Sequence, residues 1–188
     1  MRWDGWSRQK NTCSVALDRR EKSLGSDHYD TLTSVNNLAS LFLEQGKAAK
    51  ADKYFRRALA SLERTCGPDD HNLLQSMMNV GTMARNQGKF AEAKDLMSRG
   101  LEGHERNFGR DHIDTLSAVQ NLAQLFEMQG DLAEAEQFYR RAVEGCDRTL
   151  GNKSPTLDRF GCWPRRAVKQ GGEARRGRGI SHRRVHNR

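Results

Sequence analysis

The sequence predicts an all-α fold, a solenoid of stacked helical hairpins, and three observations lead to this prediction. Glycines at positions 25, 67, 109 and 151 lie 42 residues apart. Residues 25–66 and 109–150 align without a gap and are identical at 21 of 42 positions. Within these units, apolar residues recur at spacings of three and four, the pattern of an amphipathic helix. A period of roughly 20–50 residues indicates a stacked array rather than one globular core.

The first helix of each unit is marked by an apolar stripe that follows a short polar residue. In the third unit this stripe consists of Leu116, Val119, Leu122, Ala123 and Phe126. The polar residues that precede the three stripes are Asp30, Asn72 and Asp114. A side-chain oxygen at that place can cap free backbone N–H groups, so we expect these residues to start the helices. Each stripe ends in Gln-Gly, where glycine can adopt the left-handed conformation that closes a helix.

The second helix begins after two or three further residues. In the third unit its buried side is predicted to contain Ala135, Phe138, Ala142, Val143 and Cys146. Small residues fill equivalent positions in every unit: Ala39, Gly81 and Ala123 in the first helix, and Ala51, Ala93, Ala135, Ala58, Gly100 and Ala142 in the second. Because small side chains let helices approach closely, two helices joined by a glycine turn and repeated in register predict an array of hairpins.

These small residues, with Leu and Phe between them, resemble the tetratricopeptide repeat. The 42-residue period, the G-x-D-H-x-D-T-L opening and the V-x-N-L-A core are similar to the longer-helix variety found in kinesin light chains and in sensor arrays of some multidomain signalling ATPases. The resemblance covers residues 15–157 and implies a right-handed solenoid of about three and a half repeats. Since the register begins in the second helix of a unit, we expect the chain to be a fragment of a longer array.

The register also sets the expected domain boundaries. Residues 1–12 are predicted to be an irregular leader, 13–157 the array and 158–188 a disordered, basic tail. The array divides into a half-repeat at 13–24, repeats at 25–66, 67–108 and 109–150, and the broken start of a fourth at 151–157. Pro164 lies where a first helix would be in mid-course, and few apolar residues follow it. The abrupt loss of the period leads to the hypothesis that residues from about 158 onward are an out-of-frame or otherwise aberrant end.

The basic residues are concentrated in this tail. The formal net charge of the chain is +8, but residues 159–188 contain ten Lys or Arg and one acidic residue. The tail therefore carries +9 and the first 158 residues −1. A nearly neutral array is not expected to bind nucleic acid. In the alternative function, the Arg-rich tail is an RNA- or anionic-surface-binding arm, and the repeats serve as a dimerisation or scaffold element.

No catalytic pattern is present in the sequence. A phosphate-binding glycine loop, a G-x-S-x-G elbow and an H-E-x-x-H helix are all missing, so we expect no enzyme activity and no cofactor. Asp27-His28 and Asp111-His112 lie two repeats apart and offer too few ligands for a metal site.

The cysteine pattern and the hydropathy predict the cellular compartment. No C-x-x-C pair occurs among Cys13, Cys66, Cys146 and Cys162, which we interpret as small apolar residues in a reducing compartment. No run of eighteen apolar residues and no secretory signal is found, so a cytoplasmic protein without a membrane span is expected.

In the resembled family, the first helices line a concave groove that holds an extended peptide. Transferred by position, the expected peptide-binding residues are Asn36, Asn37, Ser40, Gln75, Asn79, Thr82, Arg85, Gln120, Asn121 and Gln124. An amide has both donors and an acceptor, so it can hold a peptide backbone whatever its side chains. The same amides could instead bond to the adjacent repeat, and the sequence leaves both roles open. Expected partners are therefore a protein or peptide ligand and, through uncapped apolar array ends, a second copy.

Overall fold

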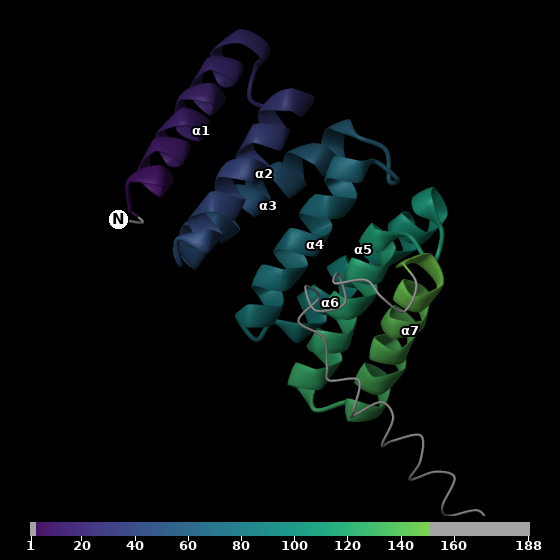
Figure 1. The fold of residues 1–188 in the computed structure, drawn as a ribbon. Helices are drawn as coiled ribbons and strands as arrows, with labels where there is room; N and C mark the ends of the chain where they lie inside the picture. The colour runs from purple at the N-terminus through teal and green to yellow at the C-terminus, as the bar shows by residue number, and fades with distance from the viewer. Residues whose placement is uncertain (1–2, 151–188) are drawn as a thin grey trace, which may run out of the picture.

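The computed structural model describes the backbone of residues 3–150 and the side chains of residues 13–149. Seven helices follow one another in this range: α1 (Trp3–Leu24), α2 (Tyr29–Glu44), α3 (Ala48–Thr65), α4 (His71–Asn86), α5 (Phe90–Phe108), α6 (Ile113–Gln129) and α7 (Leu132–Leu150). They stack side by side in chain order (Figure 1). The broken fourth repeat expected at 151–157 and the disordered tail expected at 158–188 lie outside the described residues.

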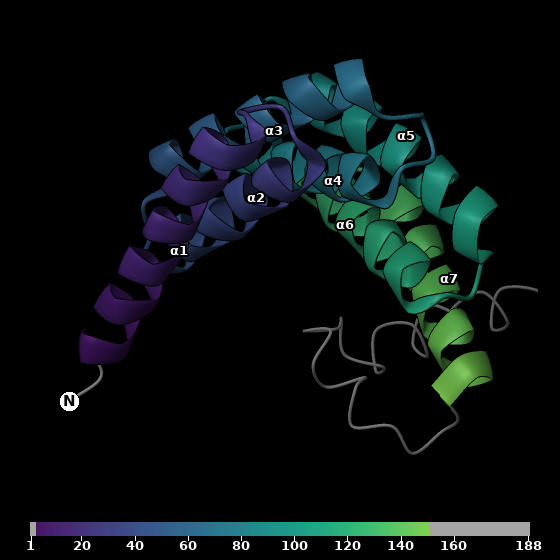
Figure 2. The ribbon, with the colours of Figure 1, turned by 90° about the horizontal axis from the view of Figure 1, so that it is seen from above.

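The hairpins curve into an arch. Helices α2, α4 and α6 lie on its inner side, and α3 and α5 lie on its outer side (Figure 2). Consecutive helices pack against each other. Helix α4 also contacts α6, the first helix of the next hairpin. The predicted all-α solenoid of helical hairpins is confirmed.

Helix α1 begins at Trp3, so the irregular leader predicted for residues 1–12 is wrong over residues 3–12. Gly5 is the only residue of α1 that strongly disfavours a helix, and no proline interrupts it. In the repeat register, α1 has the place of a second helix. Leu17 is 4% exposed and joins the core formed with α2 and α3.

The helices begin two residues earlier than the sequence predicted. In place of Asp30, Asn72 and Asp114, the N-cap residues are His28, Asp70 and His112. The backbone N–H of Asp30 donates to Nδ1 of His28 at 3.2 Å. A neutral imidazole nitrogen has a lone pair and can therefore replace the oxygen of a usual cap. Asp30 then lies in the first helical turn, where its negative charge is favourable near the helix N-terminus.

The predicted close approach of the helices at small residues is confirmed. Ala39, Ala51 and Ala58 are fully buried. A Cβ atom on Gly81 would lie 2.8 Å from Cγ of Met97, too close for an ordinary contact. A second set of close contacts was not expected from the sequence: a Cβ atom on Gly103 would collide with Leu74, and one on Gly145 with Leu116. The two pairs are 42 residues apart, so the same contact between first and second helix recurs inside successive repeats.

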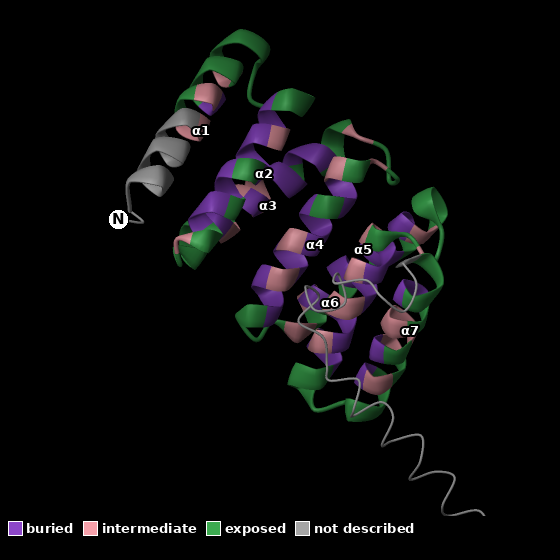
Figure 3. Cartoon of the chain, in the orientation of Figure 1, coloured by how far each residue is buried: buried purple, intermediate pink, exposed green. Residues whose placement is uncertain are grey.

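Buried residues are spread along the successive helices from α2 to α7, and many residues at the turns are exposed (Figure 3). The buried apolar side chains form two clusters, one extending from α1 to α5 and the other from α4 to α7. Phe55 and Leu62 are central to the first cluster, and Met97 and Leu122 to the second. Because each cluster spans neighbouring repeats, no repeat buries its apolar face alone.

Two series of ion pairs were not anticipated from the sequence. The first joins neighbouring repeats, and the second lies within each repeat. In the first series, an acid pairs with an arginine 36 residues further on: Glu21–Arg57, Glu63–Arg99 and Glu105–Arg141. In the second, the separation is 37 residues: Asp27–Arg64, Asp69–Arg106 and Asp111–Arg148. Both series recur at the 42-residue period. The first therefore makes the same electrostatic contact at each junction between repeats, and the second makes the same contact inside each repeat.

Candidate functional site

The candidate site is the inner face of the arch, formed by α2, α4 and α6. In α2 the core takes one side of the helix, where Leu32, Val35 and Ala39 are buried. Asn37 and Ser40, three residues apart on the opposite side, are exposed. The outer helices cover the core side, so this exposed stripe faces the inside of the arch.

The predicted peptide-binding residues differ in the solvent exposure of their side chains. Asn37, Ser40 and Gln75 are exposed. The residues of intermediate exposure are Asn79, Thr82, Gln120, Asn121 and Gln124. Asn36 and Arg85 are buried, each with 8% of its surface exposed. The structure therefore brings eight of the ten residues to one accessible face and places two beneath it.

Asn36 links two repeats, contrary to the expectation that it contacts a ligand. Its Nδ2 donates to Oγ of Ser76 on α4 at 2.8 Å. The Oδ1 of the same amide is buried without a hydrogen-bond partner. A second link runs beside it, because Nδ2 of Asn72 donates to Oγ1 of Thr33 at 2.8 Å. For Asn36, the structural alternative that the sequence left open therefore fits the burial and the contact.

Arg85 is the only cation among the predicted site residues, and it also bridges repeats. Its Nη1 donates to Oε1 of Gln124 at 2.7 Å and to the carbonyl of Asn121 at 3.4 Å. Burial lowers the pKa of the Arg85 guanidinium, and the nearby Tyr139 hydroxyl partly opposes this shift. In the part of the chain that the structure describes, no carboxylate lies within salt-bridge distance of Arg85. The guanidinium thus orients Gln124 from below the surface.

Along α4 and α2, the remaining side chains are ordered by short-range hydrogen bonds. Nε2 of Gln75 donates to Oδ1 of Asn79 at 3.2 Å, one helical turn away. The hydroxyls of Ser40 and Thr82 donate to the carbonyls of Asn36 and Met78. Since a hydroxyl oxygen keeps acceptor capacity when its hydrogen is donated, these groups can still accept from a ligand. The inner face therefore presents both donors and acceptors.

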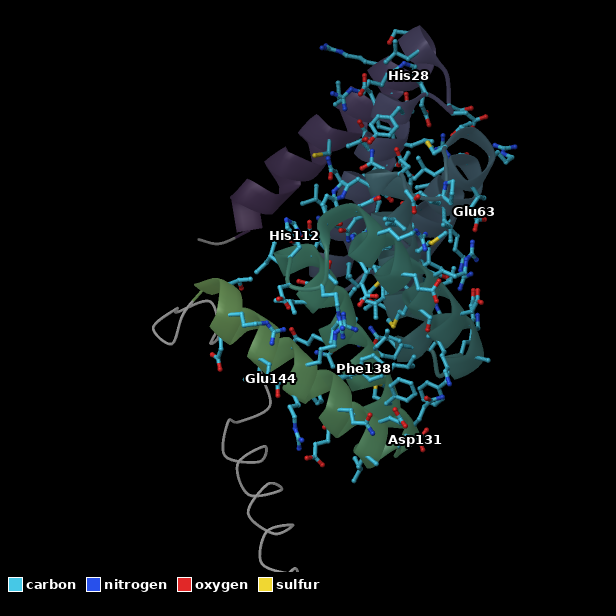
Figure 4. All side chains as sticks on the ribbon, turned by 90° about the vertical axis from the view of Figure 1, so that its right-hand side faces the viewer. His28, Glu63, His112, Asp131, Phe138 and Glu144 are labelled. Carbon is cyan, nitrogen blue, oxygen red and sulfur yellow. The ribbon has the colours of Figure 1, made fainter. Side chains whose placement is uncertain are left out.

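The histidines at the repeat junctions cap helices or pack among aromatic rings. Within residues 13–149, no group of three or more His, Cys, Asp or Glu side chains is placed to hold a metal ion. His28 and His112, labelled in Figure 4, lie at separate helix starts. His104 is buried among aromatic rings, with Phe108 at a centroid distance of 5.9 Å and His71 at 6.4 Å.

A membrane-spanning segment requires a long helix of apolar residues, and no such helix is found among the described residues.

The comparisons with known proteins agree with this geometry. The sequence model described as tetratricopeptide repeat matches residues 13–64, 34–106 and 72–148. No curated protein matches the chain significantly. The crystal structure of BtubC (BKLC) from P. vanneervenii aligns with a TM-score of 0.74 at 19% identity, covering 98% of this chain and 80% of that one. The crystal structure of Podosopora anserina putative kinesin light chain nearly identical TPR-like repeats gives 0.71 at 18% identity, covering 92% and 80%.

At these identities the solved structures show a shared fold, and the matched family model extends over most of the chain. The 42-residue hairpins, the small residues between helices and the inner stripe of α2, α4 and α6 all have the expected arrangement. The chain belongs to the tetratricopeptide repeat family.

Proposed function

We propose that the chain is a noncatalytic interaction scaffold whose inner face binds an extended peptide segment of another protein. Tetratricopeptide repeats generally mediate protein–protein interactions without catalysis. One observation carries the finer proposal: Asn37, Asn79 and Asn121 occupy the same position of three successive inner helices, and all three reach the accessible face. Regularly placed amides of this kind can hydrogen-bond to a peptide backbone, which repeats its N–H and C=O groups along the chain.

The chemistry of the face favours recognition of a peptide backbone. An extended peptide offers a donor and an acceptor at each residue, about every 3.3 Å. Asn37 and Asn121 can supply both kinds of group, and Ser40 and Thr82 can supply acceptors. The side chain of Gln124 has its oxygen engaged by Arg85, so its NH₂ group is oriented as a donor. Polar contacts of this kind fix a backbone with modest affinity and limited side-chain selectivity.

Asn36 and Arg85 support this face rather than contacting the peptide. Their hydrogen bonds run from α2 to α4 and from α4 to α6, so they hold the spacing of the inner helices. A fixed spacing keeps the three asparagines in register, which lowers the ordering cost of binding.

The test uses the full-length chain and peptides selected from a displayed random-peptide library. The best peptide is titrated against the wild type and against the double variant Asn79→Leu, Asn121→Leu by isothermal calorimetry. We expect the double variant to bind at least about tenfold more weakly, because two bonds to the backbone are lost. Gln137→Leu is the matched control, since Gln137 is an exposed amide on α7, outside the inner helices.

Circular dichroism of the same variants separates binding from folding. Retained helicity with weakened binding supports the proposal. If the double variant binds the peptide as tightly as the Gln137→Leu control, the inner face is not the binding site. A loss of helical signal in the double variant would assign Asn79 and Asn121 to structure instead.

A further inference from the structure

Helix α7 is the last described helix of the array, and one of its sides is more exposed than the same side of the earlier outer helices. Leu59 of α3 and Leu101 of α5 are 8% and 7% exposed, whereas Val143, at the same position of α7, is only partly buried. Leu132, at the start of α7, is 59% exposed, and its counterpart Phe90 packs on the core. We call this side of α7, which contains Leu132 and Val143, the terminal face.

The terminal face points away from the preceding repeat. Leu132 and Val143 are eleven residues apart, about three helical turns, so both lie on one side of α7. Arg141, which pairs with Glu105 of α5, lies two residues before Val143 and therefore on nearly the opposite side of the helix. The terminal face is thus turned toward the position of a following repeat.

In the earlier repeats, this side of the outer helix is covered by the first helix of the next repeat. Helix α4 packs on α3, and α6 packs on α5. Leu101 of α5 belongs to the same buried cluster as Val119, a residue of the apolar stripe of α6. The terminal face therefore has the apolar surface that the stripe of a further first helix would cover.

The chain supplies such a stripe directly after α7. Thr156 and Leu157 repeat Thr115 and Leu116, with one residue fewer in the preceding turn. In that register, the stripe of the third repeat is matched by five further apolar residues. The stripe Leu116, Val119, Leu122, Ala123 and Phe126 corresponds to Leu157, Phe160, Trp163, Pro164 and Ala167.

The connection to this second stripe has the length found at the earlier junction. Six residues lie between Leu150 and Leu157, and seven lie between Phe108 and Leu116. A short connection keeps the segment at a high effective concentration near the terminal face. Binding within the chain therefore has an advantage over binding of a separate molecule.

The charge of the third repeat is complementary to that of the segment. Residues 109–150 contain eight acidic residues and four arginines, a net charge of −4, whereas residues 25–66 and 67–108 carry +1 and −1. Asp131, Glu134 and Glu144 are exposed and have no salt bridge within the described part of the chain. Residues 157–167 contain three arginines and one acidic residue. The third repeat therefore attracts this segment electrostatically.

One polar contact between inner helices also extends to the segment. Nη1 of Arg85 on α4 donates to Oε1 of Gln124 on α6. One repeat later, Glu127 has the position of Arg85, and Arg165 has that of Gln124 in the register of the segment. Oε2 of Glu127 accepts from the Tyr139 hydroxyl at 2.8 Å, and no described cation lies within salt-bridge distance of this carboxylate. The same position thus places an anion opposite a cation.

We propose that residues 157–167 of this chain bind the terminal face as a fourth inner segment. Phe160 and Trp163 cover the apolar surface of α7, and Arg165 forms an ion pair with Glu127. Pro164 lacks a backbone donor and clashes with the preceding turn, so the bound segment is kinked rather than a straight helix. The repeat pattern then ends after residue 167, and the tail expected to be disordered begins there rather than at residue 158.

The first test measures how well acrylamide reaches Trp163 in the full-length chain. Trp3 and Trp6 are replaced by Phe, which leaves Trp163 as the only tryptophan. We expect acrylamide to quench Trp163 at least about twofold less in the folded protein than in the same protein unfolded in urea, because the bound indole is shielded from solvent. Equal quenching in the two states would overturn the proposal.

Leu132→Ser in the same protein tests the location of the segment. Leu132 is exposed, so its substitution leaves the described core intact but removes an apolar side chain from the terminal face. Quenching of Trp163 should rise toward the value of the unfolded protein. Val15→Ser is the matched control, because Val15 is an exposed apolar residue of α1, the first helix of the array. If Leu132→Ser leaves Trp163 as shielded as Val15→Ser does, the segment does not lie on the terminal face.

Charge reversal tests the proposed ion pair. Glu127→Arg and Arg165→Glu should each increase the quenching of Trp163, and the two changes together should restore the shielding, because the pair forms again with its charges exchanged. Glu44→Arg is the control, since Glu44 is an exposed acid in the last turn of α2. A double variant that is no better shielded than either single variant would contradict the pairing of Arg165 with Glu127.

A dilution series separates binding within one chain from exchange between two copies. Binding within the chain predicts that the quenching of Trp163 is the same at every protein concentration. A loss of shielding on dilution, with a dimer in sedimentation at the higher concentrations, would assign the terminal face to the segment of a second copy and overturn the proposal.

Discussion

Arg141 on α7 donates to the carboxylate of Glu105 on α5, and this is the least exposed ion pair between repeats in the described part of the chain. The two side chains are 23% and 31% exposed. The equivalent pairs one and two repeats earlier are more open, so this junction is the best place to measure what the periodic pairs contribute to stability.

Replacing Arg141 by Met should lower the free energy of unfolding by about 1 kcal/mol, because the pair is partly shielded from water and Met preserves much of the apolar stem. Urea denaturation followed by circular dichroism measures this change, which should shrink at high salt. Arg140→Met is the control, since Arg140 pairs with Glu136 inside α7 at 2.7 Å. A pair within one exposed helix contributes about 0.3–0.5 kcal/mol. Equal losses in both variants would show that the contact between repeats adds nothing.

Gly103→Ala should destabilise the array even though alanine favours helix formation. The new Cβ atom would collide with the Leu74 side chain on α4. Overpacking costs about 1–3 kcal/mol, whereas the helix-propensity gain over glycine is about 1 kcal/mol. Thermal unfolding should therefore show a lower midpoint. Glu102→Ala, at the exposed neighbouring position, should change it little, and a more stable Gly103→Ala protein would mean that the two helices separate without penalty.

The stability of the array should fall as the pH drops below about 6.5, the pKa of an unfolded histidine. His104 is 2% exposed, and its Nδ1 has no hydrogen-bond partner. Burial lowers its pKa and the nearby His71 and His112 lower it further, while Asp114 on α6 opposes the shift. The folded state therefore resists the proton that the unfolded state binds. Stability is complete above the unfolded pKa and decreases by up to about 1.4 kcal/mol per pH unit below it.

His104→Leu tests this assignment, because Leu62 occupies the same position one repeat earlier. Urea denaturation of both proteins near neutral pH and near pH 5.5 should show a smaller pH dependence for the variant, since it lacks the titrating group. If the variant loses as much stability in acid as the wild type, another group is responsible.

The Asn36–Ser76 bond should make a measurable contribution to the coupling of the first two complete repeats. A double-mutant cycle with Asn36→Ala and Ser76→Ala should give a coupling energy of about 1 kcal/mol in unfolding experiments. The same cycle should show little direct coupling in peptide affinity, because both residues lie beneath the surface. A large effect of Asn36→Ala on binding with unchanged stability would restore it to the ligand-contacting set.

If the basic tail is an RNA-binding arm, the full chain should retain RNA on a filter, and a chain that lacks the tail should retain much less. The comparison is between the full chain and a chain ending at Leu157, which removes the +9 segment. Salt-sensitive retention by the full chain only would favour the alternative function. Equal retention by both would eliminate it.

The fold was predictable because the 42-residue period, the glycine turns and the small buried residues can each be recognised from the spacing of residues along the chain. Gly46 and Gly88 have the left-handed φ values of 72° and 75° that the sequence predicted. The helix starts were missed because Asp30 is a residue type that commonly caps helices, whereas the residue at the cap position is His28, whose ring nitrogen accepts the backbone N–H of Asp30. Cap choice depends on the local backbone path, which a periodic pattern does not specify.

The candidate site was predictable in position but not in exposure. Asn36 and Asn37 are adjacent in the sequence and both polar, yet one is buried against Ser76 and the other is open. Which one is buried depends on the crossing of α2 over α4, a relation between repeats. The sequence does contain a pattern that indicates how neighbouring repeats pack. Acids equivalent to Glu63 and arginines equivalent to Arg99 recur at the same 42-residue period as the glycines.

The recurring acid and arginine pairs have a consequence for how such arrays can grow. Each 42-residue unit carries both an acid for the unit after it and an arginine for the unit before it. A duplicated unit inserted at a boundary would bring both an arginine for the preceding unit and an acid for the following unit. No acid or arginine of the series would then lack its ion-pair partner. Whole-unit insertion or excision is therefore electrostatically neutral in this chain, whereas an insertion of a different length would change the separation of the pair that spans it.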